Sequence, residues 1–164
     1  PMKHTISILV ENHAGVLARV AGLFARRGFN IDSLAVGVTE DEKISRITII
    51  ADGTAYTLEQ IEKQLNKLID VIKVRHLPAE ELLSRELVLI KVACQPSQRA
   101  ELISLAEIAK AKISDITVNT MTLELSDSVP RIKTFEELLR PYGIKETVRT
   151  GSIAMQKGGA SMKL

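Results

Sequence analysis

The residues best suited to chemistry in this 164-residue chain lie in one short loop, residues 12–15, between an apolar stretch and a helical pattern. Asn12 can cap the following helix with its side-chain oxygen. Gly15 allows a turn, or a close approach to a ligand, that a side chain would prevent. A helix N-terminus presents unpaired N–H groups and a partial positive charge. The loop therefore predicts a site for a small molecule that carries a carboxylate.

The same pattern also fits a purely structural role, because a strand, a loop with Asn and Gly, and a helix often follow one another. In that interpretation Asn12 caps the helix, Gly15 relieves a turn and no ligand binds. Asn30 has the same two interpretations, either a turn residue that enters a strand or a contact to a ligand. On spacing alone, the structural role is favoured.

The sequence contains no recognisable motif of catalytic or metal-binding residues. The three histidines, His4, His13 and His76, show no i, i+4 pair of the kind that binds zinc on a helix. Cys94 lies in an apolar stretch, which predicts a buried and inert thiol. No phosphate-binding glycine loop is present. We therefore expect no catalytic residue and no metal site.

Composition limits the class of protein. Hydrophobic residues make up 45% of the chain but aromatic residues only 3%, which suits sheets of Ile and Val covered by helices. The net charge is +2, and neither half has the basic excess typical of a nucleic-acid surface. One cysteine suits a reducing compartment, and no apolar run approaches about 18 residues. We expect a cytoplasmic protein that binds neither nucleic acid nor membrane.

Hydrophobic periodicity predicts the same order of elements twice. In the first half, strands are expected at 5–10, 29–38, 44–51 and 71–76, with helices at 15–27 and 58–68, the latter capped by Thr57. In the second half, Pro130 begins the second helix. The order is that of two tandem ferredoxin-like βαββαβ domains in the α/β (α+β) class. The predicted domains are 1–76 and 86–150, joined by a linker at 77–85 and followed by a mobile tail at 151–164.

Several segments resemble one known family. The sequence ILVENHAGVLARV at 8–20 and FNIDSL at 29–34 are similar to the N-terminal ACT domain of the regulatory small subunit of acetohydroxyacid synthase, also called acetolactate synthase. SRITI at 45–49, QIEKQLNKLIDV at 60–71 and RELVLIKV at 85–92 continue the resemblance. Ala14 departs from the family, in which proline often precedes the glycine, and this departure makes the loop less rigid.

The resemblance implies a set of effector-binding residues. Asn12 and Gly15 match the effector loop, and Asn30 matches a polar contact supplied by a partner chain. Backbone groups near His13, Ala14 and Val16 would meet a carboxylate. The aliphatic side chain of the effector would contact Leu17 or Ile31.

The resemblance also implies a role without catalysis. The chain would form a homodimer through its ACT domains, with the effector at their interface. It would bind and activate the catalytic large subunit of acetolactate synthase, and mediate feedback inhibition by valine, or by leucine or isoleucine, in branched-chain amino acid biosynthesis. Thiamine diphosphate, Mg and FAD would be held by the catalytic subunit only. Effector binding would shift the population of dimer arrangements.

Two other classes of function remain open at this level. The first alternative is an ACT-type, amino-acid-responsive transcription regulator, although the chain lacks a recognisable helix-turn-helix and a basic face. The second is a free-standing enzyme on a ferredoxin-like scaffold, because a fold does not fix a function. The missing acid, base and metal groupings argue against the second.

Overall fold

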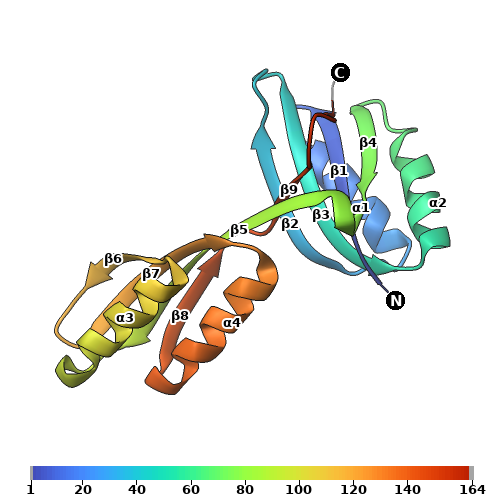
Figure 1. Ribbon diagram of the computed structural model, residues 1–164. Coiled ribbons are helices and arrows are strands. Elements are labelled where there is room, and N and C mark those ends of the chain that lie inside the picture. Colours follow the sequence, from blue (N-terminus) through green and yellow to red (C-terminus); the bar gives the residue numbers. More distant parts are fainter. Residues whose placement is uncertain (1, 163–164) are drawn as a thin grey trace. The chain divides into compact units, whose positions relative to one another are not determined.

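The computed structural model describes residues 2–162, which divide into two compact units. The first unit contains residues 2–83 together with 152–162, and the second contains residues 84–151. Each unit has one antiparallel sheet with two α-helices, in the order βαββαβ (Figure 1). This result confirms the predicted fold class of two tandem ferredoxin-like domains.

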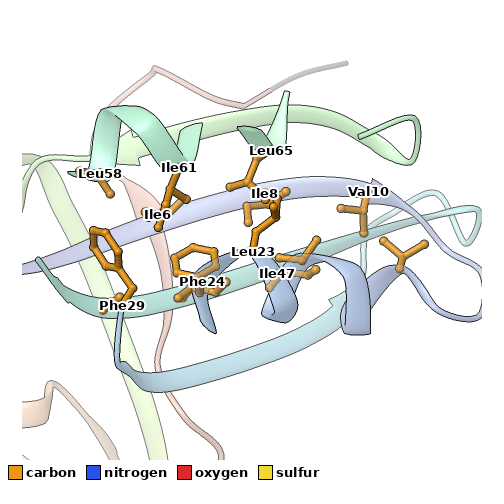
Figure 2. Close-up of a cluster of buried hydrophobic side chains, with 14 residues drawn as sticks. Ile6, Ile8, Val10, Leu23, Phe24, Phe29, Ile47, Leu58, Ile61 and Leu65 are labelled. Carbon is orange, nitrogen blue, oxygen red and sulfur yellow. The ribbon is translucent and has the colours of Figure 1, made fainter. Parts of the chain in front are cut away.

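The first sheet has the strand order β2-β3-β1-β4, so β2 and β4 are its edges. All neighbours are antiparallel. Helices α1 and α2 follow β1 and β3 in the chain, and Figure 2 shows that they pack on one face of the sheet. The bounds of the elements are β1 Met2–Glu11, α1 Val16–Arg26, β2 Ile31–Val38, β3 Ile44–Gly53, α2 Ala55–Leu65 and β4 Val71–Leu77.

Alternation along the strands builds the core of this unit. Ile6, Ile8 and Val10 of β1 are at most 2% exposed and belong to the cluster that α1 and α2 cover (Figure 2). Successive side chains of a strand point to opposite faces, so every second residue of β1 enters the same core. The helices add apolar residues at helical spacing, among them Val20, Phe24 and Ile61, all fully buried.

The opposite face of the first sheet is also buried, although no helix covers it. Ser7 and Leu9 are 0% and 4% exposed. Strand β9 (Ile153–Gln156) contacts β1 and pairs with β5. Two hydrogen bonds attach this segment to the sheet, from Ser152 N to Ser33 Oγ at 2.8 Å and from Arg46 Nη2 to Ala154 O at 2.8 Å.

This arrangement differs from the mobile tail that we predicted for residues 151–164. The composition of the segment suggested little to bury, yet Ser152 is fully buried and Ala154 is 8% exposed. Small side chains allow the backbone to lie close to the sheet, where it supplies main-chain hydrogen bonds. Residues 163–164 of the predicted tail lie outside the described residues.

The second unit repeats the pattern with the strand order β6-β7-β5-β8. Its core includes Ile90, Leu123, Ile132 and Phe135, and Cys94 is 1% exposed beside them. Pro130 lies in the first turn of its helix, as predicted. The bounds are β5 Leu82–Ala93, α3 Arg99–Ala109, β6 Lys112–Ile116, β7 Thr120–Asp127, α4 Val129–Leu139 and β8 Ile144–Arg149.

Some predicted element boundaries need correction. Thr54, not Thr57, caps α2, because the Thr54 hydroxyl accepts a hydrogen bond from Thr57 N at 3.2 Å. In the segment predicted as a linker, one helical turn was expected at 79–83; it is present as a 3-10 helix, Ala79–Glu81, but β5 already begins at Leu82. Within residues 2–162, no helix is long and apolar enough to cross a membrane.

Two histidines meet where the first strand begins. His4 Nε2 donates to Gly53 O at 3.0 Å, since a carbonyl can only accept. In neutral His4, Nδ1 is then the acceptor, and His76 Nε2 lies 3.3 Å from it. Burial, and then the proximity of His4, lowers the pKa of His76 below its ordinary value.

We predict that this pair makes the stability of the protein fall in mild acid. The unfolded chain binds a proton at His76 more readily than the folded chain, so the free energy of unfolding decreases as the pH drops below about 6.5. Urea unfolding at pH 7.5 and 5.5 measures the decrease. It should be smaller in His76→Gln than in the unaltered chain, and equal decreases in the two proteins would contradict the assignment.

Candidate functional site

The loop between β1 and α1 has a geometry that only glycine adopts easily at its last position. Gly15 has φ 86° and ψ −14°, in the left-handed region, and is the residue that precedes helix α1. No side chain caps this helix. The prediction that Asn12 caps it is therefore wrong, because the left-handed turn at Gly15 separates Asn12 from the first helical turn.

Asn12 instead fastens the loop to the neighbouring turn between β2 and β3. Its side-chain Nδ2 donates to Glu42 O at 2.9 Å, and its main-chain N donates to Lys43 O at 2.8 Å. Both bonds have carbonyl acceptors, so the amide group of Asn12 fixes the position of the loop without adding charge. The side-chain oxygen of Asn12 has no hydrogen-bond donor among the interactions of the described residues.

His13 connects the loop to the turn that precedes the edge strand β4. Its Nε2 lies 2.9 Å from Asp70 Oδ1 and 3.2 Å from Glu11 Oε2. Arg19, one turn into α1, pairs with the second oxygen of Asp70. The main chain also contributes, because Glu11 N donates to Asp70 O at 2.9 Å. These contacts connect the end of β1, the start of α1 and the turn before β4.

The cluster of Glu11, His13 and Asp70 could also be considered as a metal site, since one ligand atom of each lies within 4.8 Å of the others. The Asp70 carboxylate is already paired with Arg19, whose positive charge opposes a cation at the same place. The side chains of Glu11 and His13 are half exposed. The arrangement is explained by ion pairing, and we assign no metal to it.

The N-terminus of α1 is the part of the loop with unused hydrogen-bonding capacity. The first N–H groups of a helix have no partner within it, and no residue in the first turn of α1 is acidic. Residues 11–15 are exposed. Val16 is buried below the loop, whereas the Leu17 side chain is 41% exposed beside it. Main-chain donors and an apolar surface therefore lie side by side, which suits a carboxylate with an aliphatic group.

The structure does not bring Asn30 and Ile31 to this loop within one chain. Ile31 pairs with Ala51 of β3, whereas Glu11 pairs with Ile44 at the other end of the same strand. The two positions are seven residue steps apart along β3, which corresponds to about 23 Å. Asn30 is exposed, and its Nδ2 donates to Asp32 Oδ1 at 3.0 Å. Figure 2 shows the labelled neighbours Phe29 and Val10 at opposite ends of the core.

Sequence reasoning missed the residues that hold the loop in place. Asp70 and Arg19 were not singled out, and neither was the Glu42–Lys43 turn that binds Asn12. Asp70 immediately precedes β4, which pairs antiparallel with β1, so its proximity to Glu11 depends on strand register. The predicted ferredoxin-like order already places this turn beside the loop, because the last strand pairs with the first in that fold. The side-chain pairing with His13 could not have been predicted from spacing.

We predict opposite effects for two glycine-to-alanine substitutions in and next to α1. Gly15→Ala should lower the free energy of unfolding by about 1–2 kcal/mol, because alanine is strained in the left-handed region. The new Cβ would also lie 3.2 Å from Arg19 Nη1. Gly22→Ala is the matched control, and it should raise stability by about 0.5–1 kcal/mol.

The Gly22 substitution is tolerated because the nearest atom to its Cβ is Arg26 Nη1, at an ordinary 3.5 Å. Urea unfolding followed by circular dichroism compares both variants with the unaltered chain. A Gly15→Ala variant as stable as Gly22→Ala would show that the loop does not need the left-handed turn.

Comparison with known proteins adds independent information on this architecture. A family model described as the AHAS small subunit-like ACT domain matches residues 6–73, which include the loop and Asn30. A second model, described as the small subunit of acetolactate synthase, matches residues 85–158. The two models together span both structural units.

Curated relatives and a solved structure agree with these models. The chain is 50% identical over 157 residues to the probable acetolactate synthase small subunit of Archaeoglobus fulgidus, covering 96% of this chain and 98% of that one. It is 44% identical to the acetolactate synthase small subunit of Mycobacterium leprae, covering 94% and 92%. The crystal structure of the acetolactate synthase small subunit from Thermotoga maritima superposes with a TM-score of 0.91 at 38% identity, covering 98% of this chain and all of that one.

Proposed function

The chain belongs to the family of acetolactate synthase small subunits, which are regulatory subunits, and we propose that it activates the catalytic subunit. In this proposal it also transmits feedback inhibition by valine or a related branched-chain amino acid. The observation that carries the proposal is the exposed N-terminus of α1, with its glycine turn and its fixed loop. In this role the chain performs no catalysis. Thiamine diphosphate, Mg and FAD belong to the catalytic subunit.

The effector site would be formed mainly by main-chain groups. The carboxylate of the amino acid accepts hydrogen bonds from the N–H groups between His13 and Leu17, at the positive end of α1. The side-chain oxygen of Asn12 accepts a hydrogen bond from the ammonium group, while Asn12 Nδ2 stays bound to Glu42 O. The exposed part of Leu17 contacts the aliphatic side chain.

A second chain would complete the site. Strand β2 is an edge of the first sheet, and its residues Val36 and Val38 are 48% and 60% exposed, as expected where another strand pairs. If β2 pairs antiparallel with β2 of a second copy, the partner's strand runs in the opposite direction, so the start of one β2 lies beside the end of the other. Asn30 and Ile31 of the partner chain then lie toward the end of the sheet that carries Asn12, although these residues are about 23 Å apart within one chain.

A shared site of this kind gives a simple basis for regulation. An effector that contacts two chains binds the paired arrangement better than any other arrangement of the two domains. The catalytic subunit would sense that arrangement, so effector binding and catalytic activity become linked. The relatives match 94–96% of this chain as acetolactate synthase small subunits, and no observation favours the transcription-regulator alternative over this role.

We predict that loop substitutions separate activation from inhibition in the reconstituted enzyme. Asn12→Ala removes the bond that holds the loop, and Gly15→Asp places a negative charge where the effector carboxylate would bind. Both variants should still activate the catalytic subunit. The valine concentration for half-maximal inhibition should rise at least tenfold, which corresponds to about 1.4 kcal/mol of binding free energy.

Acetolactate formation from pyruvate is the measurement, with the catalytic subunit alone, with this chain, and with each variant over a range of valine concentrations. Gln64→Ala on α2 is the control for loss of an amide side chain. It should be inhibited like the unaltered chain. Parental valine sensitivity in both loop variants would show that the site is elsewhere, and an inability of the unaltered chain to raise activity would contradict the regulatory proposal.

A further inference from the structure

A second candidate site lies on the face of the first sheet that has no helices. There β9, the residues that follow it and the strands β3 and β4 line an open cavity of about 260 Å³, and all of its lining residues belong to the first structural unit. Figure 1 shows β9 and the chain after it beside this sheet. Two arginines, Arg46 and Arg75, line this cavity. Its other lining residues are Glu40, Leu77, Met155, Gln156, Ala160, Ser161 and Met162.

The sheet register explains why both arginines face the cavity. Arg46 of β3 pairs with Leu9, and Arg75 of β4 pairs with Ser7. Strand β1 lies between β3 and β4, and residues two apart in a strand share a face. The two guanidinium groups thus project from either side of β1 toward the same face, opposite the core residues Ile6 and Ile8.

The guanidinium of Arg46 has one fixed hydrogen bond and one buried N–H group without a partner among the described residues. Its Nη2 donates to Ala154 O at 2.8 Å, while its Nε is buried without a hydrogen-bond partner among the described residues. Arg75 Nη1 is 3.5 Å from Ser161 O, at the limit of a hydrogen bond. Neither arginine forms an ion pair with an acidic side chain in residues 2–162.

The two arginines lie in an environment that favours an anionic partner. Burial, and then the charge of Arg75, lowers the pKa of Arg46 from its ordinary value. With Glu40 included, the lining carries one net positive charge. A buried donor without a partner destabilises the folded protein, so a ligand that accepts a hydrogen bond from Arg46 would remove this cost. An anion would also offset the repulsion between the two arginines.

We propose that this cavity binds a small aliphatic carboxylate with a single negative charge, held by Arg46 and Arg75. A guanidinium is planar and can donate two parallel N–H bonds to the two oxygens of a carboxylate, which a lysine ammonium group cannot do. Leu77, Met155 and Met162 supply an apolar surface for a short hydrocarbon group. The cavity is at the small end of ligand pockets, which limits the ligand to a few carbon atoms.

The proposed carboxylate site is separate from the effector loop. The loop lies at the N-terminus of α1, on the face of the sheet that the helices cover, whereas the two arginines face β9 and the residues after it. The proposal does not depend on valine binding, so its failure can be distinguished from failure of the regulatory function. Saturating valine should leave the carboxylate site available.

Isothermal titration calorimetry of the full chain with isobutyrate tests the proposal, and saturating valine is present throughout so that the effector loop is occupied. Isobutyramide is the uncharged ligand of the same shape. Isobutyrate should bind saturably and isobutyramide should not. Arg46→Gln and Arg75→Gln should each weaken isobutyrate binding at least tenfold. Arg27→Gln, which changes an exposed arginine beyond the end of α1, is the matched control and should leave binding unchanged.

Circular dichroism checks that each variant is folded, and Arg75→Gln keeps the test decisive if Arg46→Gln does not fold. Equal binding of isobutyrate by both cavity variants and by Arg27→Gln would overturn the proposal. So would the absence of saturable binding to the unaltered chain. Sulfate that binds more tightly than isobutyrate would overturn the assignment to a carboxylate, because it would show a site for inorganic anions.

Discussion

The register of the first sheet is the constraint on which the site depends. Antiparallel pairing fixes Glu11 opposite Ile44 and Ile31 opposite Ala51, so the loop before α1 and the residues that begin β2 lie at opposite ends of β3. A shift of β1 by one residue would turn Ile6, Ile8 and Val10 away from the helices and toward the other face of the sheet, which would break up the core that they form with α1 and α2. The core thereby holds the two groups of residues in the proposed effector site about 23 Å apart within one chain.

The loop depends on main-chain groups for any binding of a ligand, because it contains no reactive side chain. The loop has no nucleophile and no tuned acid or base; its chemical character comes from the N–H groups of α1 and the left-handed turn at Gly15. Charged side chains serve to hold the loop. Asp70 connects His13 and Arg19, while Asn12 is bound to the turn before β3. A rigid loop at a helix end can bind a carboxylate with little further ordering, which favours affinity for a small effector.

The fold was predictable because its signals are local. Alternation in β1 and the Pro130 helix start needed no knowledge of the rest of the chain. The position of the loop between the first strand and the first helix was predicted correctly, but the capping role of Asn12 was not, because the left-handed turn at Gly15 places the helix start beyond the reach of Asn12. Ordering of residues 152–156 was missed for a different reason. The two buried residues, Ser152 and Ala154, are small and give little hydrophobic signal, and their hydrogen bonds to Ser33 and Arg46 join parts of the chain that are distant in sequence.

The central claim is that one effector site takes its loop from one chain and its Asn30 from another. Dimers that contain one Gly15→Asp chain and one Asn30→Ala chain, isolated with two different affinity tags, test it directly by calorimetric titration with valine. Each such dimer retains one site in which both contributing residues are unaltered, so it should bind one valine with parental affinity, whereas both parent homodimers should bind weakly. Mixed dimers that bind no better than the homodimers would show that each site is built within a single chain.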